Sequence, residues 1–189
     1  VLKSSTQEDS DNLMYEYEVG QYINKQNKIF PCFLETYGVF LYKDDASWKH
    51  AKDNITIVPN VLKNSLRMLD KIDYSVGCLK SKYIAIMVQH IKNATTFKDF
   101  YENAILRSKS VPRFKLDKLI SIYNHEIVCI LYQIYMPLAS LINEFTHYDL
   151  HTSNVLLYEP VKNSCITYNY HLISGKIVTF KSKYIAKII

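Results

Sequence analysis

Glycine, proline and arginine are all scarce in this chain of 189 residues. It holds 4 Gly and 5 Pro, too few for a chain built from flexible linkers, and no internal repeat or long low-complexity tract is present. Arginine occurs only at Arg67, Arg107 and Arg113, and the lysines are scattered along the chain. Proteins that bind nucleic acids tend to cluster these residues and interleave them with aromatics. The net charge of +5 therefore predicts no nucleic-acid partner.

Cysteine pairs with metal-ligand or redox spacing are also missing. The four cysteines (Cys32, Cys78, Cys129 and Cys165) lie far apart in apolar settings, without any C-x-x-C. They are typical of buried free thiols in a reducing compartment. The chain opens with a short Val-Leu-Lys segment and then a polar run, which is unlike a secretory signal. We therefore expect an intracellular protein.

No apolar run is long enough to cross a bilayer. The longest, residues 127–142, is shorter than the roughly 20 residues that a membrane helix needs, and Glu126 and Glu144 flank it. This run predicts a buried core helix, and we expect no membrane partner.

The composition, 48% hydrophobic and 22% charged residues, is that of an ordinary globular protein. Strand-like segments come first with one helix among them, then mostly helix, then short strands. This order predicts an α+β fold with two unequal lobes. The expected strands are 1–3, 33–42, 83–91, 155–158 and 184–189, with a hairpin at Ser174–Gly175. The expected helices are 13–27, capped by Asp11 or Asn12; one that is capped by Thr95 or Thr96 and runs through Ile105; and 116–145. Residues 43–54 are expected to form a polar loop or insertion.

The most informative segment is residues 147–154, which read H-Y-D-L-H-T-S-N and precede the apolar run 155–158. The segment places Asp149 and Asn154 five residues apart in a short loop before a strand. Phosphoryl transfer uses such a pair, because a carboxylate can accept the proton of the incoming hydroxyl and an amide oxygen can bind a magnesium ion.

The pattern H-x-D-L-x-x-x-N resembles the catalytic loop of the protein kinase superfamily, and the order of elements is similar to a kinase domain along essentially the whole chain. The resemblance implies a two-lobe kinase-like fold, with a partial N-terminal lobe at 1–91 and a partial C-terminal lobe at 92–189. It also implies ATP and Mg²⁺ as cofactors. Lys3 stands where the family keeps the lysine that holds the α- and β-phosphates. Its partner would be Glu16 or Glu18.

We prefer Glu16 because Val19 and Ile23, three and seven residues later, suit a core-facing side of the helix. The resemblance further places a hinge segment beside the adenine, where backbone N–H and C=O groups would read the base. That segment consists of Val88, Gln89, His90 and Ile91.

Within the loop, the resemblance assigns Asp149 as catalytic base and Asn154 as magnesium ligand, with His147 bonding the backbone to hold the loop. His151 counts as a catalytic residue, because it stands where many serine/threonine kinases place a lysine directed at the γ-phosphate. Histidine there is seen in haspin-like kinases and in aminoglycoside and choline kinases, which leaves the acceptor open. Tyr148 replaces the arginine that pairs with a phosphorylated activation loop, so we expect no such switch.

The family also has a Gly-rich loop ahead of the Lys3 position and a D-F-G aspartate after the Ile189 position. We therefore expect a domain truncated at both ends, with little or no phosphoryl transfer on its own. The chain looks most like kinase-like proteins of large DNA viruses with AT-rich genomes, which would place it in the host cytoplasm or the virion.

The predicted function is that of a serine/threonine protein kinase acting on a protein substrate with ATP. Two alternatives stay open: a catalytically inactive pseudokinase that serves as an interaction module, and a small-molecule kinase of the choline or aminoglycoside type. A metal-dependent hydrolase built on His147, Asp149 and His151 is less favoured, because the other histidines are isolated in the sequence. Oligomeric state and the roles of the insertions 43–54 and 161–183 are left open.

Overall fold

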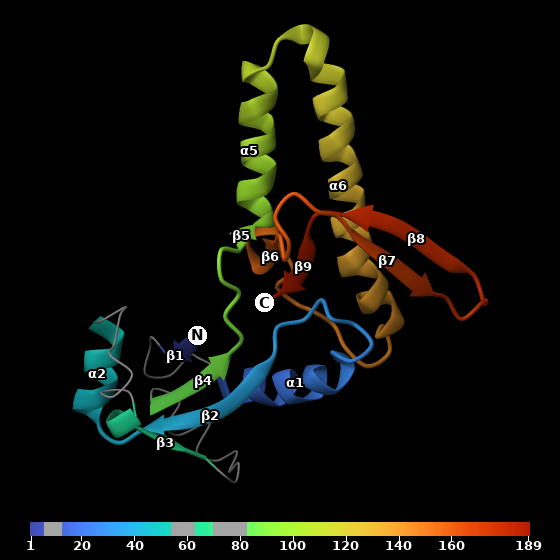
Figure 1. Ribbon diagram of the computed structural model, residues 1–189. Helices are drawn as coiled ribbons and strands as arrows, with labels where there is room; N and C mark the ends of the chain where they lie inside the picture. Colours follow the sequence, from blue (N-terminus) through green and yellow to red (C-terminus); the bar gives the residue numbers. More distant parts are fainter. Residues whose placement is uncertain (6–12, 54–62, 70–82) are drawn as a thin grey trace. The chain divides into compact units, whose positions relative to one another are not determined.

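The computed structural model describes residues 1–5, 13–53, 63–69 and 83–189, which form a mixed α+β protein (Figure 1). The strands of the described residues form three antiparallel sheets. The chain divides into two compact units. The first comprises Val1–Ile29 and Leu34–His90, and the second comprises Phe30–Phe33 and Ile91–Ile189.

The first unit is a four-stranded sheet with a helix on each face. The strand order is β1 (Leu2–Ser4), β4 (Ile84–Val88), β2 (Thr36–Tyr42) and β3 (Leu66–Met68). Successive side chains of a strand point to opposite faces, so alternate residues of β4 serve different cores. Ile84 and Ile86 pack with Leu13 and Met14 of helix α1 (Leu13–Gln26). Ala85 packs on the other face with Trp48.

Residues 43–54 were expected to be a polar loop, and this expectation is wrong, because they contain helix α2 (Asp45–Asp53). The side chain of Asp44 accepts a hydrogen bond from the backbone N–H of Ser47 at 2.7 Å, which caps the helix. One apolar anchor secures it: Trp48 is 3% exposed, and its indole N–H donates to the Ser5 carbonyl. A single tryptophan among polar residues produces no apolar periodicity, which is why the pattern failed to indicate a helix.

The expected strands and helices were mostly right in kind and too long or too short at their ends. The strands expected over 33–42 and 83–91 cover only Thr36–Tyr42 and Ile84–Val88. The expected caps of α1, Asp11 and Asn12, lie outside the described residues.

The second unit combines a small sheet with two long helices. Its sheet has the order β5 (Thr95–Thr96), β6 (Val155–Tyr158) and β9 (Ile185–Ile188). Helix α5 (Phe97–Ser110) is capped by Thr96, as expected, and runs five residues beyond the expected end at Ile105. The cap is a hydrogen bond from the backbone N–H of Asp99 to Thr96 Oγ1, 3.0 Å long.

Helix α6 (Arg113–Ser140) begins and ends earlier than the expected 116–145. It buries two polar side chains against the C-terminal strands. Gln133 Nε2 donates to the Tyr184 carbonyl, while Gln133 Oε1 accepts from the N–H of Ala186 at 2.9 Å. Glu126 accepts a 2.7 Å hydrogen bond from Ser182 Oγ. Buried polar groups need such partners, so α6 fixes the position of β9. No helix in the described part of the chain is long and apolar enough to span a membrane.

The hairpin expected at Ser174–Gly175 is present as β7 (Ile166–His171) and β8 (Ile177–Ser182). Gly175 has a φ of 77°, a conformation that favours glycine in the turn. One face carries an aromatic cluster, whose members contact one another ring to ring: Tyr132 from α6, Tyr168, Tyr170 and Phe180.

The expectation of buried cysteines holds for Cys32 and Cys129 and is wrong for Cys165, which is exposed; Cys78 lies outside the described residues. Because burial raises the pKa of the Cys32 thiol to about 12, almost no reactive thiolate forms there near neutral pH.

At pH 8 we expect iodoacetamide to label Cys165 about 100-fold faster than Cys32. Peptide mass mapping over time measures both rates, and their ratio should approach one in denaturant. Equal rates in the folded protein would contradict this burial.

Candidate active site

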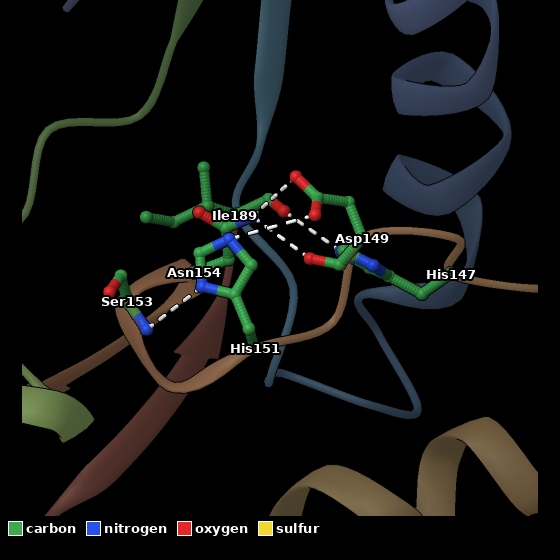
Figure 2. Close-up of polar contacts among 6 residues, drawn as sticks. All are labelled: His147, Asp149, His151, Ser153, Asn154 and Ile189. Carbon is green, nitrogen blue, oxygen red and sulfur yellow. Dashed lines mark hydrogen bonds and ion pairs between the residues drawn. The ribbon is translucent and has the colours of Figure 1, made fainter.

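The loop ahead of β6 brings Asp149 and Asn154 into direct contact (Figure 2). The amide nitrogen Nδ2 of Asn154 donates to the backbone carbonyl of Asp149 at 2.9 Å and to its carboxylate oxygen Oδ2 at 3.0 Å. The second bond orients the Asp149 carboxylate, and the first ties the Asn154 amide to the Asp149 backbone. They also occupy the donor end of the amide, so the oxygen Oδ1 of Asn154 is the end that can bind a cation.

A short turn, η2 (Thr152–Asn154), shapes the loop between these two residues. His151 caps it: the backbone N–H of Ser153 donates to His151 Nδ1 at 3.2 Å, and the N–H of Asn154 donates to the His151 carbonyl at 2.9 Å. Because Nδ1 accepts, the ring hydrogen of a neutral His151 sits on Nε2. That nitrogen lies 3.6 Å from Asp149 Oδ1. His151 therefore contacts the candidate base itself.

The loop is tied to the end of β9 at two points. His147 Nε2 lies 3.0 Å from the Ile189 carbonyl, and the N–H of Ile189 donates to the Asn154 carbonyl at 2.9 Å. The first contact is a bond from His147 to the backbone, of the kind that the resemblance implies for this residue. Together with the β6–β9 ladder, these bonds give the loop a fixed frame (Figure 2).

The Asp149 end of the loop is open to solvent. The Asp149 side chain is 80% exposed, and Tyr148 beside it is 90% exposed. Tyr148 carries no charge that could pair with a phosphate. An exposed carboxylate held by one amide can receive a proton from a hydroxyl group that approaches it.

In the first unit, Lys3 and Glu16 form an ion pair. Lys3 Nζ lies 2.6 Å from Glu16 Oε2. The reason is visible in the register, because Lys3 is opposite Ile86 on β4, and Ile86 packs in the core that α1 covers. Directly opposite residues of paired strands share a face, so Lys3 points to the side where Glu16 stands in the first turn of α1. The side chains are 51% and 43% exposed.

The position of α1 depends on a contact that the sequence did not indicate. The backbone of Thr36 on β2 bonds to two side chains of α1: its N–H donates to Asn24 Oδ1, and its carbonyl accepts from Asn24 Nδ2 and Gln21 Nε2. Gly20 lies against the same Thr36, so close that a Cβ there would be 2.7 Å from Thr36 Cβ. Glycine destabilises the interior of a helix, so its presence there often marks a close approach of the backbone to another element. Gly20 in the predicted helix was therefore the one sequence feature that pointed to this contact.

The expected hinge residues differ in what their backbones can offer a base. The N–H of Val88 donates to the Val1 carbonyl, and that of Gln89 donates to the Glu35 carbonyl at 2.7 Å. Because these two N–H groups already have acceptors, the hinge N–H groups that stay candidates for reading a base are those of His90 and Ile91. The Ile91 carbonyl accepts from Ala94.

The structure thus gathers Asp149, His151 and Asn154 in one loop of the second unit, and Lys3 with Glu16 in the first. Within the described residues, no group of three or more His, Cys, Asp or Glu side chains lies close enough to hold a metal ion. The pattern H-x-D-x-H therefore does not gain the further ligands that a hydrolase centre would require.

No family model matches this chain, and no curated protein or solved structure matches it either.

Proposed function

We propose that this chain is a phosphotransferase of the protein kinase type, which uses ATP and Mg²⁺ and is directed at serine or threonine of a protein. The observation that carries the proposal is the double hydrogen bond from Asn154 Nδ2 to Asp149. It supports the proposal because it fixes a proton acceptor and leaves an amide oxygen for a cation, the two groups that phosphoryl transfer needs in one loop.

Asp149 would act as the base. Its carboxylate accepts the proton of the acceptor hydroxyl while Asn154 holds the carboxyl plane, so the hydroxyl oxygen is oriented for attack on a phosphoryl group. His151 stands beside the other carboxylate oxygen, with Nε2 at 3.6 Å from Asp149 Oδ1. His147 contributes by position alone, through its contact with the Ile189 carbonyl.

The residues present suit a magnesium ion in part. Magnesium takes hard oxygen ligands and commonly binds one or two protein groups plus substrate phosphates, and Asn154 Oδ1 is such an oxygen. When bound, the ion would neutralise charge on the transferred phosphate. Lys3 would hold the nucleotide phosphates. The ion pair with Glu16 keeps the flexible Lys3 side chain extended in one direction.

The proposal predicts that ATP with Mg²⁺ raises the melting temperature of the chain and that Lys3→Met weakens this effect. Removing a charged hydrogen bond to phosphate costs about 1.5–3 kcal/mol, so we expect the apparent ATP affinity to fall at least about 10-fold. Melting temperatures recorded over an ATP titration give the affinity. Lys43→Met, which changes an exposed lysine in the same unit, is the matched control and should leave the affinity unchanged.

Wild-type protein that ignores ATP and Mg²⁺ would overturn the proposal. The titration should be run on this chain and on any longer product of its reading frame, with identical controls. Binding without any phosphoryl transfer by the longer product would favour the pseudokinase alternative. Transfer to small cationic alcohols but not to a protein acceptor would favour the small-molecule kinase.

A further inference from the structure

Helices α5 and α6 of the second unit form an arm whose outer half is uncovered (Figure 1). The two helices run side by side away from the β5–β6–β9 sheet and are joined at residues 111–112. From residue 105 to residue 125 no residue is buried. The arm's buried contacts lie nearer the sheet, at Phe97, Phe100 and Ala104 of α5 and from Glu126 onward in α6.

The outer end of this arm, residues 106–118, which we call the arm tip, is strongly cationic. It carries five cationic side chains and one anionic side chain, Asp117, a net charge of +4 out of the +5 of the whole chain. All five cations are exposed. They are Arg107, Lys109, Arg113, Lys115 and Lys118. The lysines that seemed scattered along the sequence therefore include one local cluster.

Large apolar side chains stand among these cations and are turned to solvent. Phe114, in the first turn of α6, is 80% exposed, and Leu106, near the end of α5, is 62% exposed. Lys115 Nζ lies 5.4 Å from the centroid of the Phe114 ring. Because these two side chains are not part of the core, placing them in another apolar environment disrupts no packing within the protein.

We propose that the arm tip binds the surface of a bilayer that contains anionic phospholipids. Such a surface is complementary in both respects: the lipid phosphates and carboxylates attract the cluster of cations, and the boundary between headgroups and acyl chains takes up Phe114 and Leu106. Single-stranded nucleic acid would instead use a series of aromatic rings as a stacking platform, and the tip offers one ring, with an aliphatic residue as its companion. The proposal concerns binding at the surface, not spanning.

This inference departs from the expectation of no membrane partner and does not depend on the proposed phosphotransferase activity. The chemistry involves only residues of the arm tip, none of which belongs to the loop around Asp149 or to the Lys3–Glu16 pair. A failure of either proposal therefore leaves the other standing.

Co-sedimentation of the whole chain with phosphatidylcholine vesicles, with and without phosphatidylserine, tests the proposal. We expect binding only when phosphatidylserine is present, and weaker binding at higher salt. Each cation near an anionic surface contributes about five-fold in affinity, so Lys109→Ser with Lys115→Ser should weaken binding about 25-fold. Phe114→Ser should weaken it as well. The melting temperature should not change in these variants, because the side chains are exposed.

The turn of the β7–β8 hairpin provides a matched control. Ile173 is fully exposed and Lys176 is exposed nearby, so Ile173→Ser with Lys176→Ser removes one apolar and one cationic side chain from a place without a cation cluster. This variant should bind like the unaltered chain. Three results would each overturn the proposal: equal binding to neutral vesicles, equal loss in the control variant, or binding to DNA or RNA oligonucleotides but not to vesicles. The last result would assign the tip to nucleic acid.

Discussion

In any longer product of the reading frame that transfers phosphate, replacing Asp149 with asparagine is expected to lower the transfer rate by about a thousand-fold while nucleotide binding stays nearly unchanged. The substitution keeps the shape of the side chain, and the new amide oxygen can still accept the hydrogen bond from Asn154 Nδ2 that holds the loop. What is lost is the ability to take a proton from the acceptor hydroxyl. Transfer of the labelled γ-phosphate of ATP to a generic protein acceptor measures the rate, and the melting-temperature titration measures binding.

Asp117→Asn is the matched control for this result. Asp117 is an exposed aspartate on α6 of the same unit, remote in sequence from the loop, so the change in charge is the same while transfer should not change. If Asp149→Asn transferred phosphate as fast as the unaltered protein, Asp149 could not be the base. If the longer product bound ATP without transferring phosphate, the loop would serve structure or binding only.

The second large effect is expected from Gly20→Ala in the middle of α1. Alanine normally stabilises a helix by about 1 kcal/mol over glycine, but here the added Cβ would lie 2.7 Å from Thr36 Cβ and closer still to its hydroxyl oxygen. Thr36 cannot retreat, because its backbone is bonded on both sides to Asn24. Overpacking of this kind costs roughly 1–3 kcal/mol or more. We expect a net loss of about 2 kcal/mol in the free energy of unfolding, measured by urea denaturation.

Two further variants isolate this cause. Thr36→Ala removes the hydroxyl and methyl groups that meet the new Cβ, so the double variant should recover part of the stability lost in Gly20→Ala. Gly38→Ala is the control, because a Cβ at Gly38 would meet only the Phe40 ring at 3.3 Å and the flexible end of Met68 at 3.5 Å. Because α1 carries Glu16, Gly20→Ala should also weaken the response to ATP; a stability like that of the unaltered chain would contradict the close approach.

Much of the local structure follows from patterns that short segments carry on their own. Thr95 or Thr96 was expected as a cap, because a hydroxyl before an amphipathic stretch can accept from an N–H of the first turn. Thr96 is the cap, and it accepts from the N–H of Asp99. The strongly apolar run 83–91 predicted the strand that is β4, and Ser174–Gly175 predicted the hairpin turn, where Gly175 has a positive φ. The ends of helices and strands were predicted less well, because the last helical turn or the last pair of strand residues depends on the elements that pack against it.

Features that rest on one residue meeting a distant one were missed. Helix α2 depends on Trp48, whose indole bonds to the Ser5 carbonyl, and no periodic signal marks a single anchor. The exposure of Cys165 and the engagement of Val88 by Val1 likewise depend on what folds against them. The cationic arm tip was overlooked because a charge cluster becomes significant only when the fold leaves it uncovered.

Local patterns were enough to predict the α+β class and the short loop at residues 147–154, because both depend on periodicity and on residues a few positions apart. A partner for Lys3, Glu16 or Glu18, was implied by the resemblance to the kinase family. Tertiary structure alone decided that Lys3 faces α1, that Thr36 and Gly20 fix that helix, and that Ile189 anchors the loop. These contacts join residues far apart in the chain, and their geometry follows from strand register and packing. The register of paired strands depends on which face each strand buries against the rest of the fold, so a short segment of sequence does not specify it alone.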